Sequence, residues 1–273
     1  MLRNRTLSVI GAGMMGTALA RGTIQAGAMS PDALTLFDVH PLKARALAEE
    51  LGPGTRVASD ISEAANNSDL ILLAVKPFVL PQVLAEIGSI LRPEQIVISI
   101  AAGIGLKRLE GIISAPIPVV RAMPNTPCLV GYGITAVCRG SHATQEHLET
   151  AKSLFASVGE ALEVEEKHMD AVTAISGSGP AYVYLMIEAM ADAGVKAGLT
   201  RDISRLLASQ TVLGAAKMVL STDEHPAQLR DNVTTPGGTT IAALAVLERA
   251  GLRSALGDAI DAAIQRSREL STS

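Results

Sequence analysis

The sequence predicts a two-part fold, with a Rossmann-type, doubly wound parallel sheet over residues 1–166 and an all-α half over residues 167–273. A complete G-x-G-x-x-G motif at Gly11–Gly16 lies between an apolar strand and a helix. Apolar strands and helical stretches alternate through the first half, as in a parallel sheet covered on both faces. After about Lys167 no convincing strand pattern appears again.

The composition is typical of a globular protein, with 273 residues of which 48% are hydrophobic and 18% charged. A net charge of −4 without any run of Lys and Arg argues against a nucleic-acid partner. No apolar run approaches the ~20 residues that a membrane span requires, and the first residues do not resemble a signal peptide. Cys128 and Cys138 have no metal-binding spacing and form no disulfide framework, so we expect a cytoplasmic protein without a metal or membrane partner.

The elements of the first half follow from short apolar runs and the helix formers between them. We expect strands at 6–10, 34–38, 70–75, 95–102, 117–121, 133–139 and 161–164. Helices are expected at 17–25, 43–51, 80–91 and 143–159.

The second half reads as helices at 168–197, 201–220, 239–249 and 254–270. Ala, Leu, Met and Gly dominate them, so these helices must be buried nearly all round. About a hundred residues of helix cannot bury so much surface alone, and we expect a homo-oligomer with helices of two chains intertwined. The alternative is burial against the chain's own α/β half only.

The glycine motif places three glycines where a dinucleotide-binding turn needs them. Gly11 permits a tight turn, Gly13 lets a pyrophosphate approach the backbone, and Gly16 allows close packing of helix on strand. The helix that follows offers free N–H groups and a positive dipole end to phosphate. We therefore expect Gly11, Ala12, Gly13, Met14 and Met15 to bind a cofactor, the alternative being a purely structural glycine-rich turn.

The residue after the second strand bears on which cofactor is used. Asp38 lies 22 residues beyond Gly16, where an acidic side chain usually binds the ribose hydroxyls and disfavours a 2′-phosphate. His40 and Lys43 follow closely, and either is able to meet a phosphate. The choice between NADH and NADPH stays open, as does the alternative that Asp38 only forms a turn.

The ends of the later strands complete the expected cofactor rim. Val75 and Lys76 follow the third strand, and Ala101 and Ala102 follow the fourth with side chains small enough to lie against a nicotinamide. After the fifth strand, a rigid proline-bounded turn aims the amide of Asn125 toward the same edge. Each of these segments, taken alone, is equally well explained as a structural turn.

A second glycine turn stands in the helical half. Thr234–Thr240 (TTPGGTT) precedes an apolar helix, and its glycines open the helix N-terminus to a carboxylate. The alternative is an ordinary threonine-rich helix cap. A further run of small residues, Ser176–Pro180, interrupts a helix and forms either a packing notch or a surface that faces a ligand.

Several runs together resemble the pyrroline-5-carboxylate reductase family. They are VKP at 75–77, MPNTP at 123–127, SGSGPAY at 176–182, GAAKM at 214–218 and HPAQLRDNVTTPGGTT at 225–240. The resemblance covers nearly the whole chain and implies a Rossmann domain with a helical dimerisation domain. It also implies reduction of Δ1-pyrroline-5-carboxylate to L-proline with NADPH or NADH, by dimers that assemble into larger rings such as a decamer.

The resemblance implies roles for individual residues. It places Gly11 to Met15 at the pyrophosphate, Ala101 and Ala102 by the nicotinamide, and Asn232 at a cofactor. The implied substrate-binding residues are Glu166, Thr235, Gly237, Gly238, Thr239 and Thr240. Two departures bear on cofactor preference: Asp60-Ile61 stands where the family often has an asparagine, and Asp38 is acidic.

The expected catalytic group is the Thr240 hydroxyl, hydrogen-bonded to the ring nitrogen of the imine. A protonated imine is already a strong electrophile, so no powerful acid is needed; His225 is better explained as a helix-start residue beside Pro226. One rival function is a β-hydroxyacid-type dehydrogenase, but Lys196 and Lys217 lack the neighbours of that catalytic lysine. The other rival is a non-catalytic dinucleotide-binding protein.

Overall fold

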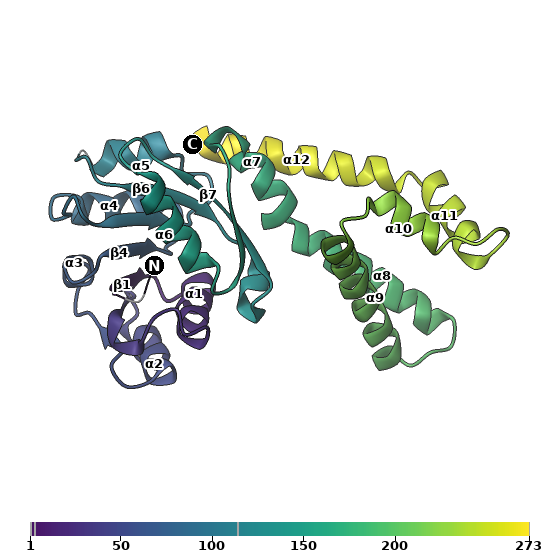
Figure 1. Cartoon of the computed structure of the whole chain (residues 1–273), viewed down its shortest axis with the longest axis horizontal. Coiled ribbons are helices and arrows are strands. Elements are labelled where there is room, and N and C mark those ends of the chain that lie inside the picture. Colours follow the sequence, from purple (N-terminus) through teal and green to yellow (C-terminus); the bar gives the residue numbers. More distant parts are fainter. Residues whose placement is uncertain (1, 3, 114, 273) are drawn as a thin grey trace. The chain divides into compact units, whose positions relative to one another are not determined.

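The computed structural model of the chain describes residues 2, 4–113 and 115–272 (Figure 1). The chain divides into two compact units. The first comprises Met1–Ser178 with Ala263–Ser273, and the second comprises Gly179–Ala262. The units thus meet in sequence after Ser178, and the boundary expected after residue 166 remains a prediction.

The first unit is built on an eight-stranded sheet in the order β3-β2-β1-β4-β5-β6-β7-β8. The first six strands in this order are all parallel to one another, which is the doubly wound Rossmann arrangement that the sequence predicts. The strands are β1 (Leu7–Ile10), β2 (Leu34–Phe37), β3 (Arg56–Val57), β4 (Leu70–Leu73), β5 (Ile96–Ser99), β6 (Val119–Met123), β7 (Gly133–Arg139) and β8 (Gly159–Glu163).

The last two strands run in the opposite direction to the first six, which the sequence pattern does not predict. Strand β7 is antiparallel to β6, and β8 is parallel to β7. Only a short 3₁₀ turn, η2 (Thr126–Val130), separates β6 from β7, and a connection without a crossover helix joins antiparallel strands. The two-residue strand β3 is too short to leave a hydrophobic pattern and was not expected.

Helices cover both faces of this sheet (Figure 1). Side chains alternate along each strand: in β4, Leu70 and Leu72 join one apolar cluster while Ile71 and Leu73 join the other. The first cluster includes residues of α1 (Met14–Gln25), α2 (Pro41–Leu51) and α6 (Gln145–Phe155). The second includes residues of α3 (Ile61–Asn66), α4 (Leu80–Ile87) and α5 (Leu106–Ile113). Helices α3 and α5 were not expected from the sequence.

The first unit ends in a helical segment that changes its hydrogen-bond spacing. A 3₁₀ turn, η3 (Glu166–His168), leads into α7 (Met169–Val172), which continues as a π-helical turn, η4 (Thr173–Gly177). The single helix expected over 168–197 is therefore interrupted where the run of small residues begins. The Ser267 hydroxyl, near the C-terminus, donates to the Asp170 carboxylate in α7 at 2.6 Å.

The second unit contains helices only among its described residues, as the sequence predicts. They are α8 (Gly179–Lys196), α9 (Arg201–Thr222), α10 (Pro226–Asn232), α11 (Thr239–Arg249) and the first part of α12 (Leu252–Thr272). Gly194 of α8 lies against Ser204 of α9, so close that a Cβ on the glycine would be 2.7 Å from the serine Oγ. Helix α10 was not expected, although His225 does begin it by accepting the Ala227 N–H through Nδ1.

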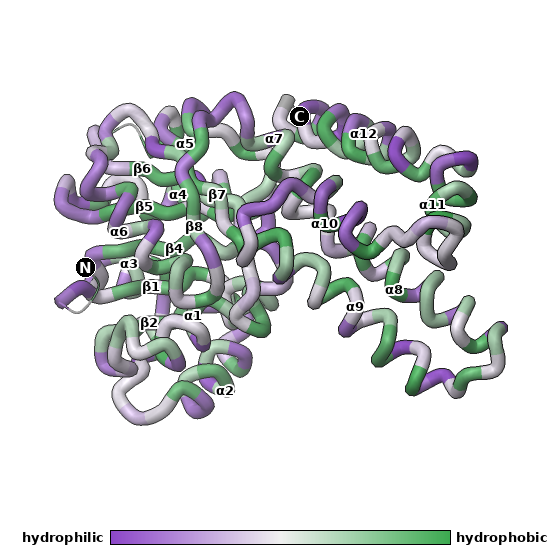
Figure 2. Tube along the Cα trace, turned by 45° about the vertical axis from the view of Figure 1, so that its right-hand side comes forward, coloured by the Kyte–Doolittle hydropathy of each residue, from purple (hydrophilic) through white to green (hydrophobic). Residues whose placement is uncertain are grey.

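Many large apolar side chains of the second unit are exposed. Hydrophobic residues occur along the whole lengths of α8 and α9, with hydrophilic residues between them (Figure 2). Exposed examples are Tyr184, Leu185, Met186, Met190, Ile203, Leu206, Leu207, Leu213, Met218 and Leu220. A surface of this kind is typical of a subunit interface. None of the described helices is long and apolar enough to cross a membrane.

Both cysteines are buried in the first unit, and neither forms a disulfide. Burial raises the pKa of both thiols, and that of Cys138 reaches about 12 because the Glu166 charge adds to the desolvation. We expect both thiols of the folded protein to react slowly with a disulfide reagent at about pH 8, and quickly in urea.

The same pKa shift gives the sign of a pH effect. Unfolded thiols ionise near pH ~8.5, so above that pH the unfolded chain binds fewer protons and the free energy of unfolding falls. Cys138→Ser should remove part of this alkaline loss, measured by urea unfolding. Rapid reaction of the Cys128 and Cys138 thiols with the disulfide reagent in the native protein would contradict their burial.

Candidate functional site

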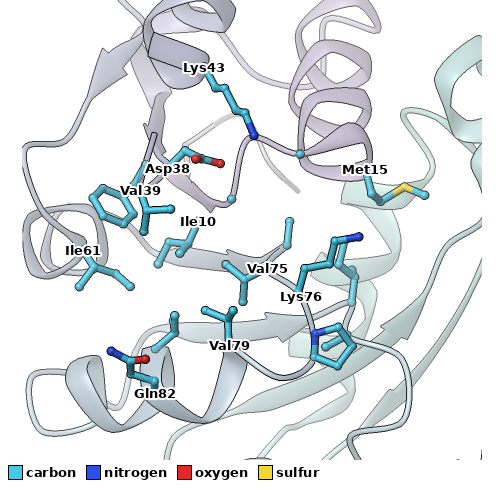
Figure 3. Close-up of a pocket in the computed structure, with 18 of the residues that line it drawn as sticks. Ile10, Met15, Asp38, Val39, Lys43, Ile61, Val75, Lys76, Val79 and Gln82 are labelled. Atoms are coloured by element: carbon cyan, nitrogen blue, oxygen red, sulfur yellow. The ribbon is translucent and has the colours of Figure 1, made fainter. Parts of the chain in front are cut away.

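A cleft of about 750 Å³ opens where the parallel strands of the first unit end (Figure 3). Its walls include residues at or after the carboxyl ends of β1, β2, β3, β4, β5 and β6. From β1 the chain adds β2 and β3 on one side, and β4 then pairs with the other side of β1. The order in which strands are added therefore reverses between β1 and β4. Ligands of open α/β sheets bind at such switch points, and the volume is that of a small-molecule site.

The glycine turn forms one wall of the cleft through backbone rather than side chains. Gly11 has a φ of +108°, and a Cβ there would lie 2.7 Å from the Ala74 carbonyl oxygen. A Cβ on Gly16 would lie 2.0 Å from the Gly11 oxygen, so α1 can pack this closely only on glycine. At Gly13, by contrast, no described atom lies within 4 Å of an added Cβ.

The open side of Gly13 fits an anionic group. Gly13 is the N-cap of α1, no described side chain caps the helix there, and its first turn holds no acidic residue. The first N–H groups of the helix and its positive dipole end thus face the cleft unneutralised. These residues fit the pyrophosphate of a dinucleotide, as the sequence predicts.

The Asp38 carboxylate braces this turn from the end of β2. Its Oδ2 accepts the Ala12 N–H at 2.8 Å, and its Oδ1 accepts the His40 N–H at 2.8 Å. Asp38 also lines the cleft, with Lys43 reaching from α2 toward the same turn (Figure 3). The side chain therefore does form a turn, and it remains at the position where a ribose is expected.

The far end of the cleft is an apolar slot that sequence reasoning missed. Val39, Ile61 and Val79 come from three separate segments, and Gln82 of α4 lies at its edge (Figure 3). Apolar side chains of this kind suit an adenine ring. The sequence signal is weak: Val79 follows the Val75-Lys76-Pro77 turn by two residues.

Most residues expected at the cofactor do line this one cleft. They are Gly11, Gly13, Met14, Met15, Asp38, Val75, Lys76, Ala101 and Ala102, joined by Met123 and Pro124. Ala12 is not among the lining residues, since its N–H is bound to Asp38 and its side chain is buried. The cofactor-binding roles of Ala12 and of the lining residues remain predictions. The position of the lining residues supports theirs, and the position of the Ala12 side chain does not.

Asn125 has partners inside the protein. Its Oδ1 accepts the Ile134 N–H at 2.9 Å, and its Nδ2 donates to the Ser176 carbonyl at 3.1 Å. The residue is only 8% exposed, so its amide holds the π-helical turn against the start of β7. Gly177 packs on Met123, where an added Cβ would be 2.8 Å from the methionine Cε. Gly177 therefore packs closely in a notch, while at Gly179 of the same run nothing lies within 4 Å of an added Cβ. Contact of Asn125 with a cofactor stays a prediction.

Glu166 lies away from the cleft, in an ion pair that the sequence did not reveal. Its Oε1 accepts Nη1 of Arg121 at 3.1 Å and the Leu106 N–H at the start of α5 at 2.6 Å. Arg121 is 7% exposed, so the carboxylate compensates a buried guanidinium. This structural role is established by the contacts, whereas substrate binding by Glu166 remains a prediction.

The second glycine turn lies entirely in the second unit. Gly237 has a φ of +68°, and Gly238 is the N-cap of α11. A Cβ on Gly238 would lie 2.3 Å from Oγ1 of Thr235, so glycine is required for that contact. Thr239 and Thr240 form the first turn of α11, which has no side-chain cap and no acidic residue. Asn232 instead bonds within its own unit, to Gln228 and Glu224.

The glycine turn yields a paired prediction. Gly13→Ala should cost at most about 1 kcal/mol of stability, because the new methyl meets no protein atom. It should weaken dinucleotide binding about 10-fold or more by occupying the approach of the pyrophosphate. Gly16→Ala should destabilise by about 3 kcal/mol, because its methyl overlaps backbone. Urea unfolding and calorimetric titration with NADH measure the two effects; equal stability losses would contradict this geometry.

The Arg121 ion pair yields a second prediction. Glu166→Ala should cost about 2 kcal/mol of stability, because it leaves a buried guanidinium and a helix N–H unpaired, partly offset by water at the exposed side. Glu166→Gln should cost less, since it keeps an acceptor. Glu165→Ala serves as the control: that carboxylate pairs with Lys167 at 2.7 Å on the surface and should change stability by less than about 0.5 kcal/mol.

Known proteins match the chain along nearly its whole length. It is 48% identical to the pyrroline-5-carboxylate reductase of Synechocystis, covering 97% of both chains, and 44% identical to that of Methanosarcina acetivorans, covering 98% and 99%. Family models described as "Pyrroline-5-carboxylate reductase dimerisation" and "NADP oxidoreductase coenzyme F420-dependent" match residues 166–270 and 6–103.

Solved structures agree with the sequence matches. The chain superposes on a pyrroline-5-carboxylate reductase from Coxiella burnetii with a TM-score of 0.93 and 36% identity, covering 98% of this chain and 99% of that one. The pyrroline carboxylate reductase of Plasmodium falciparum, solved with NADP bound, gives a TM-score of 0.89 and 35% identity, covering 99% and 100%. The resemblance seen in the sequence is therefore confirmed: the chain belongs to the pyrroline-5-carboxylate reductase family.

Proposed function

We propose that this chain reduces the C=N bond of Δ1-pyrroline-5-carboxylate with NADH or NADPH and releases L-proline. The observation that carries the proposal is near-full-length similarity to proteins named for this reaction, on a chain whose cleft fits a dinucleotide. No observation favours the β-hydroxyacid dehydrogenase or the non-catalytic binding protein.

The first unit supplies the cofactor site in this proposal. The uncapped N-terminus of α1 binds the pyrophosphate, and the apolar slot at Val39, Ile61 and Val79 holds the adenine. Ala101 and Ala102 also line the cleft, and in this proposal their small side chains leave room for a nicotinamide. When bound, the reduced nicotinamide supplies the hydride that the reaction needs.

The second unit supplies the substrate site in this proposal. The first N–H groups of α11 bind the substrate carboxylate, as an uncapped helix N-terminus favours an anion. The Thr240 hydroxyl donates to or accepts from the ring nitrogen and orients the imine. Thr235, Gly237, Gly238 and Thr239 complete the proposed substrate-binding residues of this unit, and Asn232 is proposed to meet a cofactor. Glu166, in the first unit, is proposed separately as a substrate-binding residue.

We also propose a cytoplasmic homo-oligomer of at least a dimer, with a decamer as a larger ring of dimers. The exposed apolar side chains of α8 and α9 and the match to a dimerisation model support the dimer. The two free thiols suit a reducing compartment.

A spectrophotometric assay tests the proposed reaction. Purified protein mixed with Δ1-pyrroline-5-carboxylate should consume the absorbance of NADH or NADPH and form proline in equal amounts. Protein that oxidises neither cofactor under these conditions, while remaining folded by circular dichroism, would contradict the reductase assignment.

The Thr240 role yields a prediction with matched controls. Thr240→Ala should lower kcat/KM for the imine about 10–100-fold, the loss expected for one such hydrogen bond. Thr240→Ser should restore most of it, because the hydroxyl returns. Thr234→Ala is the control, since that hydroxyl already donates to the Arg230 carbonyl at 2.7 Å. Wild-type kinetics in Thr240→Ala would refute the role.

A further inference from the structure

We propose that Asp38 makes this cleft selective for NADH over NADPH, because its carboxylate is fixed where a 2′-phosphate would lie. The inference rests on the proposed use of a dinucleotide and adds which of the two is bound. A solved relative was crystallised with NADP bound, which does not fix the cofactor preference of this chain. The preference has to be argued from the residues of this chain.

The Asp38 carboxylate is held at both oxygens. The Ala12 N–H donates to Oδ2 and the His40 N–H donates to Oδ1, each at 2.8 Å. Backbone groups on two different elements therefore fix the side chain, and turning it away would leave both N–H groups unpaired. Each oxygen keeps a lone pair for a ribose hydroxyl, whereas a 2′-phosphate would bring about two more negative charges against it.

The segment after β3, the strand next to β2, offers a phosphate no spare donor from Ser59. Both the N–H and the hydroxyl of Ser59, which lines the cleft, donate to the Glu63 carboxylate at 2.7 Å. Asp60, the next lining residue, accepts the Glu63 N–H at 2.7 Å and so caps α3. Donors that serve a 2′-phosphate in other sites are here already bound to carboxylates.

Acidic and basic side chains both line the cleft after β2 and β3. They are the carboxylates of Asp38 and Asp60, and the side chains of His40 and Lys43. Lys43 is the one lysine among these four residues. Its side chain reaches toward the glycine turn (Figure 3), where it is placed to meet the pyrophosphate that both cofactors share.

Calorimetric titration measures this selectivity without turnover. ADP-ribose and its 2′-phosphorylated form are the probes, with NAD⁺ and NADP⁺ as the full cofactors. We expect the 2′-phosphate to weaken binding about 10–100-fold at moderate salt, from charge repulsion at short range. Equal or tighter binding of the phosphorylated probe by the wild-type protein would overturn the proposal, whatever the reductase assay gives.

Three variants assign the selectivity to its source. Asp38→Asn removes the charge but keeps one acceptor, and should narrow the affinity ratio to within about 3-fold. Asp60→Asn still caps α3 and should narrow it in part. Glu49→Gln, on the exposed side of α2 and outside the cleft, should leave the ratio unchanged. If Asp38→Asn keeps the wild-type affinity ratio, Asp38 is not the discriminating residue, whatever Asp60→Asn does.

The binding and activity results are separable. Selective binding without proline formation would contradict the proposed reaction and leave this inference standing. Proline formation with a preference for NADPH would contradict this inference and leave the reaction standing.

Discussion

The close approach of the glycine turn to strand β4 is the constraint on which the rest of the first unit depends. Gly11 touches the Ala74 carbonyl, and Gly16 sits on Gly11, with no room for a Cβ at either contact. This packing sets the N-terminus of α1 directly over the end of the sheet. Because Gly13 is left open, the same turn that packs the helix also exposes its N–H groups to the cleft.

Asp38 bonds to the glycine turn and also lines the cleft. Its carboxylate accepts the Ala12 and His40 N–H groups, so the turn-forming role that the sequence left as an alternative is present, and the cofactor-binding role stays a prediction. Both oxygens of this side chain are held by backbone N–H groups, so the proposed charge selectivity and the stability of the turn depend on the same residue. The second unit repeats the principle at Gly238, where glycine again leaves a helix N-terminus without a side-chain cap.

The sequence predicts the strongly patterned parts of this molecule and misses those that depend on tertiary contacts. Apolar runs and the glycine motif are local signals, and they predict the parallel strands, the order of the halves and most of the expected residues that line the cleft. Strand β3 has two residues and α3 has six, too few for a periodic pattern. The apolar slot at Val79 and the Arg121–Glu166 pair join distant segments, so no local pattern contains them. Asn125 was expected at the cofactor because it lies in the rigid turn after the fifth strand. Its amide bonds to backbone on both sides, and contact with a cofactor stays a prediction.

Hydrogen–deuterium exchange of the whole protein, with and without saturating NADH, tests the central claim most directly. If the cleft at the strand ends is the cofactor site, NADH should slow exchange at the glycine turn, at the residues after β4 and at the start of α4. Protection confined to other segments, or none despite measured binding, would contradict the account.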